Sequence, residues 1–191
     1  MLQSTLIRFQ LQGVEKNKNE KSIIAEYAAS LVEQGDFVYI DAGTTTGYML
    51  GYLNNSKSVF VTNAVTHAKK LALQGNKVIL IEGELKGSTE ALVGGYAAAS
   101  LKKFHFSKGF FGTNGLSKKA GFTTPDTSEA LVKNKAMEQC KECYVLADQS
   151  KFDKISPVTF QQFGRATIIT ESKPEGYMEC ENIIAVYVMF L

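Results

Sequence analysis

Residues 37–47 read Phe-Val-Tyr-Ile-Asp-Ala-Gly-Thr-Thr-Thr-Gly and combine a buried-strand pattern with a polar turn. The continuous apolar run at 37–40 is typical of a strand covered on both faces in a parallel sheet. The polar part contains a glycine, which permits a tight turn, and three hydroxyl groups, and it leads into a short helix predicted from about Tyr48 to Leu53. Because a helix start offers unpaired N–H groups and a partial positive charge, the turn is predicted to bind an anion. Capping of the helix by a threonine is the alternative interpretation.

The rest of the chain alternates short apolar runs with segments of helical periodicity. Further strands are predicted at 59–61, 78–81, 109–111, 144–147, 167–169 and 183–188, and helices at 22–32, 64–73, 97–103 and 127–139. Residues 85–89 and 112–115 are predicted as a polar loop and a glycine-rich loop. Strands that alternate with helices of this length indicate βαβ crossovers. The sequence therefore predicts an α/β fold with a mostly parallel, Rossmann-like sheet flanked by helices.

Composition narrows the class of protein. The chain has 191 residues, of which 45% are apolar and 21% charged, as is typical of a globular domain with one core. Its net charge of +2 is too small to attract a polyanion strongly, so we do not expect the chain to hold DNA by itself. The first residues are charged where a signal peptide would be apolar, and no apolar run is long enough to span a bilayer. A cytoplasmic protein without a membrane partner is predicted, with a lead-in segment at 1–21 and one effector-binding domain at 22–191.

The predicted ligand site lies at one edge of the sheet, because open parallel sheets bind ligands beyond the carboxyl ends of their strands. Hydroxyl, amide, carboxylate and lysine side chains follow the predicted strands there, together with small residues that let a ligand approach the backbone. The predicted ligand-binding residues are Asp41, Gly43, Thr44, Thr45, Thr46, Thr62, Asn63, Gly83, Glu84, Asn114, Gly115, Glu129, Lys133, Asp148 and Lys151. This inventory suits a polyhydroxylated anion such as a sugar phosphate. No metal and no cofactor are predicted, because no cluster has the spacing of metal ligands.

Three of these residues have structural alternatives. Asp126 and Glu129 have capping-box spacing, so Glu129 could cap its helix, contact a ligand, or do both. Lys133 lies one turn further along the same helix face and could form an ion pair with Glu129. Lys151 could pair with a phosphate group or with Asp148, and spacing alone does not rank these two partners.

Five short motifs occur in order along the chain. They are D-x-G-T-T at 41–45, T-N at 62–63, G-E at 83–84, G-x-T at 121–123 and D-x-S-K-F at 148–152. With these motifs, the region from about Ile23 to Thr170 resembles the C-terminal sensor domain of DeoR-type transcriptional repressors. Where the family has G-G-E, this chain has Glu82-Gly83-Glu84. We expect the added carboxylate of Glu82 to change that loop and to influence ligand choice.

The resemblance implies a fold similar to ribose-5-phosphate isomerase and glucosamine-6-phosphate deaminase, a phosphorylated sugar as effector, and a homo-oligomer. It also implies that operator DNA is bound through an N-terminal winged helix-turn-helix. This sequence does not contain that element, so residues 1–21 are interpreted as the remnant of a linker to it. Within the family the chain looks most like the fructose-operon repressors, which suggests fructose 1-phosphate as the effector.

A sugar-phosphate isomerase or deaminase on the same scaffold is the alternative function. Such an enzyme needs a base near the C1–C2 carbons of the sugar, and Asp148, Glu84 and Glu129 are the candidates. The D-G-A-D-E-like and K-G-G-G segments of the isomerase are absent, and His67 and His105 are interpreted as structural. A nucleotide-binding Rossmann enzyme is disfavoured because the chain has neither G-x-G-x-x-G nor the P-loop lysine. We therefore predict a regulatory domain without catalytic residues, and not an enzyme.

Overall fold

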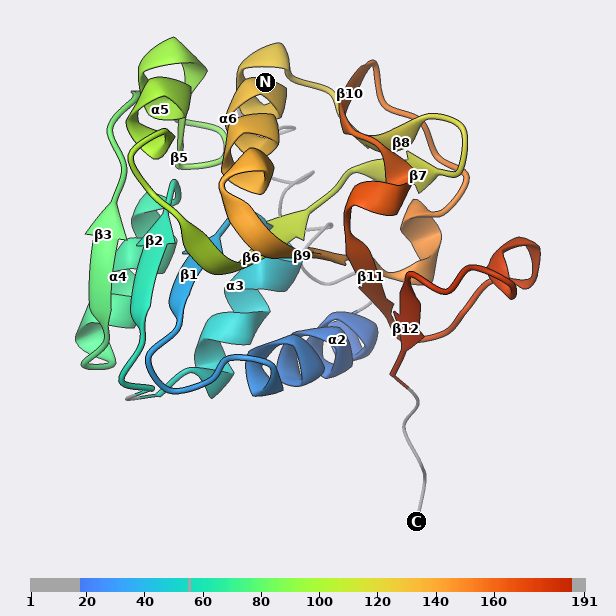
Figure 1. Ribbon diagram of the computed structural model, residues 1–191, viewed down its shortest axis with the longest axis horizontal. Coiled ribbons are helices and arrows are strands. Elements are labelled where there is room, and N and C mark those ends of the chain that lie inside the picture. The colour runs from blue at the N-terminus through green and yellow to red at the C-terminus, as the bar shows by residue number, and fades with distance from the viewer. Residues whose placement is uncertain (1–17, 55, 187–191) are drawn as a thin grey trace, which may run out of the picture.

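The fold is built on a seven-stranded sheet whose neighbouring strands all run parallel (Figure 1). The computed structural model describes residues 18–54 and 56–186. The strand order is β12-β11-β9-β6-β1-β2-β3. The bounds are β1 Phe37–Ile40, β2 Val59–Thr62, β3 Lys77–Leu80, β6 Phe106–Gly112, β9 Cys140–Leu146, β11 Thr167–Thr170 and β12 Ile183–Ala185. The predicted α/β fold with a mostly parallel, Rossmann-like sheet is confirmed.

Helices cover both faces of this sheet, with α5 and α6 above it and α2 and α3 below it in Figure 1. The helices are α2 Lys18–Ser30, α3 Thr44–Met49, α4 Val65–Leu73, α5 Gly94–Leu101 and α6 Thr127–Glu138. Within β1, Tyr39 belongs to the core cluster that includes residues of α5 and α6, whereas Val38 and Ile40 belong to the cluster that includes residues of α2 and α3. Because successive residues of a strand point to opposite faces, burial on both faces produces the continuous apolar run seen in the sequence.

Two small antiparallel elements overlap the ends of the predicted loops or lie in segments for which no strand is predicted. A hairpin is formed by β4 Glu84–Lys86 and β5 Ala91–Val93. A three-stranded sheet is formed by β7 Gly115–Ser117, β8 Gly121–Thr124 and β10 Val158–Gln161. The predicted loops at 85–89 and 112–115 are wrong at the residues that belong to β4 and β7, and β5, β8 and β10 are not predicted at all. These strands are three or four residues long, so their alternation of apolar and polar residues is too short to be recognised in the sequence.

Three element boundaries also differ from the prediction. Helix α3 begins at Thr44 and not near Tyr48, so the threonines form its first turn; the 3₁₀ helix η1, Leu50–Tyr52, continues it. Helix α2 begins at Lys18, inside the segment interpreted as a lead-in, while residues 1–17 lie outside the described residues. Strand β12 ends at Ala185, and the predicted continuation to residue 188 falls largely outside the described part of the chain.

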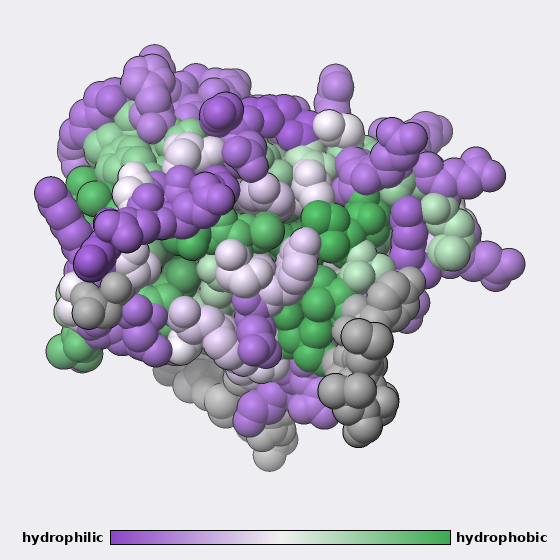
Figure 2. Space-filling view, turned by 60° about the horizontal axis from the view of Figure 1, so that its bottom comes forward, coloured by the Kyte–Doolittle hydropathy of each residue, from purple (hydrophilic) through white to green (hydrophobic). Residues whose placement is uncertain are grey.

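Helix α2 is packed as part of the domain. It buries Ile24, Ala25 and Ala28 completely, and Lys21 is only 5% exposed. Figure 2 brings this side of the molecule forward and shows apolar surface in the middle of the face, with polar surface around it. Within residues 18–54 and 56–186, no helix combines the length and the apolar character needed to cross a membrane.

Candidate functional site

A cavity of about 640 Å³ opens beyond the carboxyl ends of β1, β2 and β6. Nine of the predicted site residues line it: Asp41, Gly43, Thr44, Thr45, Asn63, Asn114, Glu129, Lys133 and Lys151. Thr66, His67, Thr89, Glu90 and Thr113 also line it and were not among the predicted residues. The cavity therefore brings together side chains from six separate segments of the chain, at the sheet edge that the strand pattern indicates.

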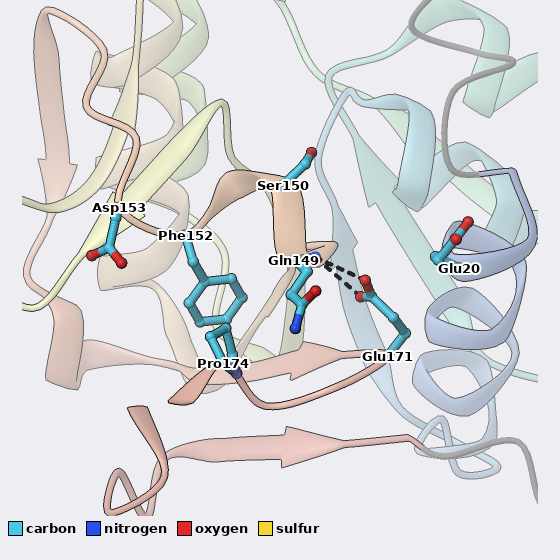
Figure 3. A pocket seen from close by; sticks show the side chains of 7 residues that line it. All are labelled: Glu20, Gln149, Ser150, Phe152, Asp153, Glu171 and Pro174. Carbon is cyan, nitrogen blue, oxygen red and sulfur yellow. Dashed lines mark hydrogen bonds between the residues drawn. The ribbon is translucent and has the colours of Figure 1, made fainter. Parts of the chain in front are cut away.

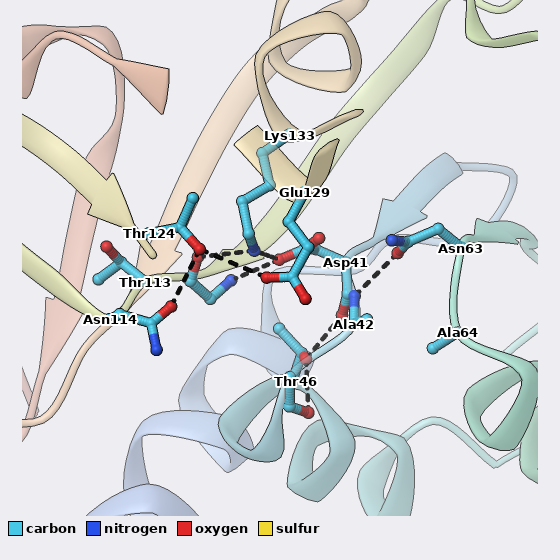
Figure 4. Close-up of polar contacts among 12 residues, drawn as sticks. Asp41, Ala42, Thr46, Asn63, Ala64, Thr113, Asn114, Thr124, Glu129 and Lys133 are labelled. Carbon is cyan, nitrogen blue, oxygen red and sulfur yellow. Dashed lines mark hydrogen bonds and ion pairs between the residues drawn. The ribbon is translucent and has the colours of Figure 1, made fainter. Parts of the chain in front are cut away.

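The cavity contains a buried ion pair between Asp41 at the end of β1 and Lys133 on α6 (Figure 4). The Nζ of Lys133 contacts the Asp41 carboxylate and also donates to the carbonyl oxygen of Gly112 at 3.1 Å. The Gly112 N–H donates to Asp41 Oδ2 at 3.1 Å. Asp41 is 1% exposed, and its burial raises the pKa of the carboxyl despite the opposing effect of Lys133. The interpretation of Lys133 as the helical partner of Glu129 is wrong, because the ammonium crosses to Asp41 instead.

The three threonines of the polar turn have different surroundings. Thr44 is exposed and Thr45 is nearly buried, and both line the cavity. Thr46 is fully buried, and its hydroxyl donates to the carbonyl oxygens of Asp41 at 2.7 Å and Gly43 at 3.0 Å. The expectation that all three hydroxyls face an anion therefore does not describe Thr46, which holds the turn in shape from the inside.

Asn63 ties two walls of the cavity together. Its Oδ1 accepts from the Ala42 N–H at 2.9 Å, and its Nδ2 donates to the Leu92 carbonyl oxygen at 3.3 Å. The Leu92 N–H donates back to the carbonyl oxygen of Asn63 at 2.7 Å. The Asn63 side chain thus fixes the turn after β1 relative to the β4–β5 hairpin.

The start of α6 supplies the opposite wall. Asp126 caps the helix by accepting from the N–H groups of Ser128 at 2.8 Å and Glu129 at 3.0 Å, as the capping-box spacing predicts. The side chain of Glu129 contributes in a different way, because its Oε1 accepts from Lys86 Nζ at 2.9 Å. Glu129 therefore lines the cavity with its charge already paired.

Lys151 approaches the cavity from η2, Gln149–Lys151. Asp148 is the N-cap of this turn and accepts from the N–H and the hydroxyl of Ser150. Among the described residues, Lys151 forms no ion pair. The proposed alternative partner Asp148 thus acts as a cap, and the Lys151 ammonium is left available to an anion in the cavity.

Six predicted site residues do not line the cavity: Thr46, Thr62, Gly83, Glu84, Gly115 and Asp148. Thr62 Oγ1 accepts from the Ala64 N–H at 3.1 Å, which shapes the turn into α4. Glu84 is exposed on β4.

The added carboxylate of Glu82 also lies away from the cavity, 3.7 Å from the ammonium of Lys103. We find no contact through which Glu82 would influence the choice of ligand.

Gly83 occupies a position where a residue with a Cβ would be disfavoured both by the backbone angle and by lack of space. Its φ is +146°, and a Cβ built there would lie 2.8 Å from the Cβ of Ala97. We predict that Gly83→Ala lowers the free energy of unfolding by about 1–3 kcal/mol through strain and overlap. Urea denaturation would measure this loss. Gly87→Ala is the matched control in the same hairpin, because no atom lies within 4 Å of its added Cβ. Equal stability of the two variants would contradict the prediction.

His67 lines the cavity, although its sequence context indicates a structural role. It is 7% exposed on α4, and its Nδ1 is buried without a hydrogen-bond partner. Burial lowers the pKa of His67 to about 4, against a smaller opposing effect of a hydrogen bond with the Gly43 backbone. The sequence pattern that could have indicated a buried His67 is its helical spacing with Ala68 and Leu71. This spacing places the imidazole on the inward face of α4.

The lowered pKa of His67 predicts acid sensitivity. The imidazole is neutral in the folded protein at neutral pH, and protonation below about pH 6.5 favours the unfolded chain. Stability is therefore complete above pH 6.5 and falls between pH 6.5 and 4, by about 3 kcal/mol at most. His67→Gln should flatten this part of the stability profile in urea titrations, whereas the exposed His105→Gln should not. Profiles of the same slope in all three proteins would refute the assignment.

A second pocket of about 450 Å³ lies beside η2, whose residues Gln149 and Ser150 line it (Figure 3). Three carboxylates, Glu20, Asp153 and Glu171, line it, and no lysine or arginine among the described residues does. Glu171 accepts from the Gln149 N–H at 3.0 and 3.2 Å. Without a lysine or arginine among the described residues of its lining, this pocket has no positive charge to balance an anion, so the strand-end cavity, which Lys133 and Lys151 line, is the candidate effector site.

The parallel sheet and the polar cavity at its strand ends define an α/β ligand-binding domain of the Rossmann-like type. The chain belongs to the DeoR family of transcriptional regulators, because the family model described as the DeoR C terminal sensor domain matches residues 16–172. Within the described residues, no group of three or more His, Cys, Asp or Glu side chains is placed to hold a metal ion.

The chain is similar to several transcriptional regulators. The chain is 46% identical over 166 residues to the "Uncharacterized HTH-type transcriptional regulator FruR" of Bacillus subtilis, covering 86% of this chain and 66% of that protein. It is 34% identical over 173 residues to the regulator IolR of the same organism, covering 90% and 68%. It is 35% identical over 153 residues to a lactose phosphotransferase system repressor of Staphylococcus aureus, covering 78% and 61%. The chain thus spans about two thirds of the length of these relatives.

Solved structures share the fold at low sequence identity. Ribose 5-phosphate isomerase A from Methanocaldococcus jannaschii superposes with a TM-score of 0.54 at 14% identity, covering 72% of this chain and 55% of that one. The delta subunit of eIF2B from Chaetomium thermophilum gives a TM-score of 0.57 at 18% identity, covering 86% and 60%. The implied similarity of fold to ribose-5-phosphate isomerase is confirmed.

Proposed function

We propose that this chain is the effector-binding domain of a DeoR-family repressor and that a phosphorylated sugar binds in the strand-end cavity. The observation that carries the proposal is the distribution of charge in the cavity. The carboxylates of Asp41 and Glu129 are each paired with a lysine, and that of Glu90 is exposed to solvent, whereas Lys151 has no ion-pair partner within the described residues. A phosphate group supplies the missing counter-charge.

The lining also offers groups for the sugar. The hydroxyls of Thr44 and Thr45 and the amide of Asn114 can bond to hydroxyl or phosphate oxygens, and the paired carboxylates can accept from sugar hydroxyls. We therefore propose the phosphate toward Lys151 and the sugar ring toward Asp41 and Glu129. Fructose 1-phosphate is the first ligand to test, because the chain resembles fructose-operon repressors and is 46% identical to the regulator named FruR.

We propose that the effector regulates DNA binding by shifting the equilibrium between two arrangements of a homo-oligomer. The effector would bind one arrangement of a homo-oligomer more tightly than another and thereby change the operator affinity of a DNA-binding domain outside this chain. Support comes from the family and from the names of the relatives, which are transcriptional regulators and repressors. We also propose residues 22–191 as the sensor domain, with the first turn of α2 extending it to Lys18.

Thermal melting with a panel of sugars tests the proposal. The panel contains fructose 1-phosphate, glucose 6-phosphate, ribose 5-phosphate, unphosphorylated fructose and inorganic phosphate. At a hundredfold excess over Kd, a cognate phosphosugar should raise Tm by about 5–10 °C, while fructose should not raise it. The absence of any shift with the three phosphosugars at millimolar concentration would contradict the proposal.

We propose a binding domain in preference to an isomerase or deaminase. Of the three candidate bases, Glu84 is exposed outside the cavity, Asp148 caps η2, and Glu129 is paired with Lys86. Glu84 and Asp148 do not line the cavity, and Glu129, which does, is held in an ion pair, whereas a proton transfer at the sugar carbons requires a base that is placed to accept the proton. An NMR time course with ribose 5-phosphate should show no conversion beyond the buffer rate, and turnover above it would establish the enzymatic alternative.

A further inference from the structure

Lys86 bridges two carboxylates without lining the cavity itself. It lies on β4, and its Nζ is 2.8 Å from Asp126 Oδ2 and 2.9 Å from Glu129 Oε1. Thr89 of the same hairpin also donates to Glu129 Oε1, at 3.3 Å. Burial opposes the charge of Lys86, but its hydrogen bonds with Asp126 and Glu129 outweigh this effect and raise its pKa. Lys86 therefore stays charged and joins the hairpin to the start of α6.

The hairpin is also anchored on its other side. The Val65 N–H donates to the Glu90 carbonyl oxygen at 3.0 Å, and the Leu92 N–H donates to that of Asn63 at 2.7 Å. The connection between β4 and β5 is thus held between the end of β2 and the start of α6. Because Thr89 and Glu90 line the cavity, this connection is one of its walls.

The contacts of Glu129 leave one of its oxygens available. Its Oε1 accepts two hydrogen bonds, from Lys86 and Thr89, which use both lone pairs. Its Oε2 accepts a single long bond of 3.4 Å from the Thr124 hydroxyl. The Glu129 side chain is 15% exposed and lines the cavity. Oε2 is therefore an acceptor with spare capacity, fixed in position and attached to a carboxylate whose charge is compensated.

We propose that Lys86 contributes to recognition of the sugar by positioning Glu129, so that Glu129 Oε2 accepts a hydrogen bond from a hydroxyl of the sugar. This inference rests on the proposed function. Without the ammonium of Lys86, Glu129 would lose the ion pair that holds its Oε1, and the carboxylate would be free to rotate away from the sugar. Lys86 is accordingly a positioning residue for the sugar, while the phosphate is held by Lys151.

Titration calorimetry on single and double variants tests the inference. The probes are inorganic phosphate and whichever of fructose 1-phosphate, glucose 6-phosphate and ribose 5-phosphate binds the unmodified chain most tightly. Lys86→Met should weaken phosphosugar binding at least tenfold and phosphate binding no more than about threefold, since only the sugar loses a hydrogen bond. Lys103→Met is the matched control, because Lys103 pairs with Glu82 of the same region in an exposed ion pair. Its phosphosugar affinity should stay within twofold of the unmodified chain.

A double-mutant cycle distinguishes positioning from general loss of structure. Glu129→Gln alone should weaken phosphosugar binding, and adding Lys86→Met to it should cost little more, because Lys86 acts through Glu129. Lys86→Arg should restore binding to within about threefold. Three results would overturn this inference but not the proposed function. They are additive losses of affinity in the double variant, equal losses for phosphate and phosphosugar, and full phosphosugar binding by Lys86→Met. If Lys86→Met does not fold, Glu129→Gln and Lys86→Arg decide the question. Failure of the unmodified chain to bind any of the three phosphosugars would overturn the proposed function as well.

Discussion

Lys151→Met should reduce the affinity for a phosphosugar by about 10- to 100-fold. A hydrogen bond to a charged group contributes about 1.5–3 kcal/mol, and tenfold in affinity corresponds to about 1.4 kcal/mol. The structural reason is that Lys151 lines the cavity from η2 and forms no ion pair within the described part of the chain. The methionine keeps an unbranched side chain one atom shorter than that of lysine and removes the charged ammonium with its hydrogen-bond donors. Titration calorimetry with fructose 1-phosphate and inorganic phosphate measures the change.

The control for this variant is Lys154→Met. Lys154 lies three residues further along the chain, is exposed, and does not line the cavity. It should bind both ligands as the unmodified chain does. Unlike Lys86→Met, the Lys151 variant should lose affinity for phosphate and phosphosugar alike. If Lys151→Met retained full affinity for inorganic phosphate, the assignment of Lys151 to the phosphate would be refuted.

Lys133→Met should lower the free energy of unfolding by about 3–5 kcal/mol, the cost of leaving one charge of a buried pair without its partner. Asp41 is 1% exposed and Lys133 is 5% exposed, so neither charge can be hydrated when the other is removed. The variant also removes the donor to the Gly112 carbonyl oxygen, which joins α6 to the end of β6. Urea denaturation monitored by circular dichroism measures the loss.

The same helix supplies the control for this prediction. Lys135 pairs with Glu138 at the surface, where ion pairs contribute about 0–1 kcal/mol, so Lys135→Met should be nearly neutral. The double variant Asp41→Asn/Lys133→Met should recover part of the stability lost in Lys133→Met, because it leaves no buried charge. A loss below about 1 kcal/mol in Lys133→Met would show that the pair is hydrated or dispensable.

The strand-end location of the site could be predicted from sequence because it depends on local periodicity. The apolar run of β1 and the helix-forming stretch of α6 each indicate their own structure within a dozen residues. In a parallel sheet this information also places the residues after each strand at a common edge. The hairpin β4–β5 and the short strands β7, β8 and β10 could not be predicted in this way, because their pairing joins residues whose local pattern is weak.

The partners of the charged residues were open to misinterpretation for a related reason. Spacing along α6 suggested Glu129 as the partner of Lys133, yet Lys133 pairs with Asp41, which is 92 positions away in the sequence. Glu129 pairs with Lys86, 43 positions away. Sequence spacing reports neighbours on one helix, whereas a long side chain binds whatever charge the packing of other elements brings within reach.

Apolar periodicity and turn residues alone were therefore sufficient to predict the parallel α/β architecture and the sheet edge at which the cavity opens, since both follow from the local directions of side chains. The hydrogen-bond and ion-pair partners of the polar side chains were decided only by the tertiary structure. In the folded chain Thr46 faces inward and His67 lines the cavity. Asp41 and Glu129 each form an ion pair with a lysine, whereas Lys151 has no ion-pair partner within the described residues. The physical reason is that charge pairing depends on distances between elements remote in sequence, and those distances exist only after the sheet and helices have packed.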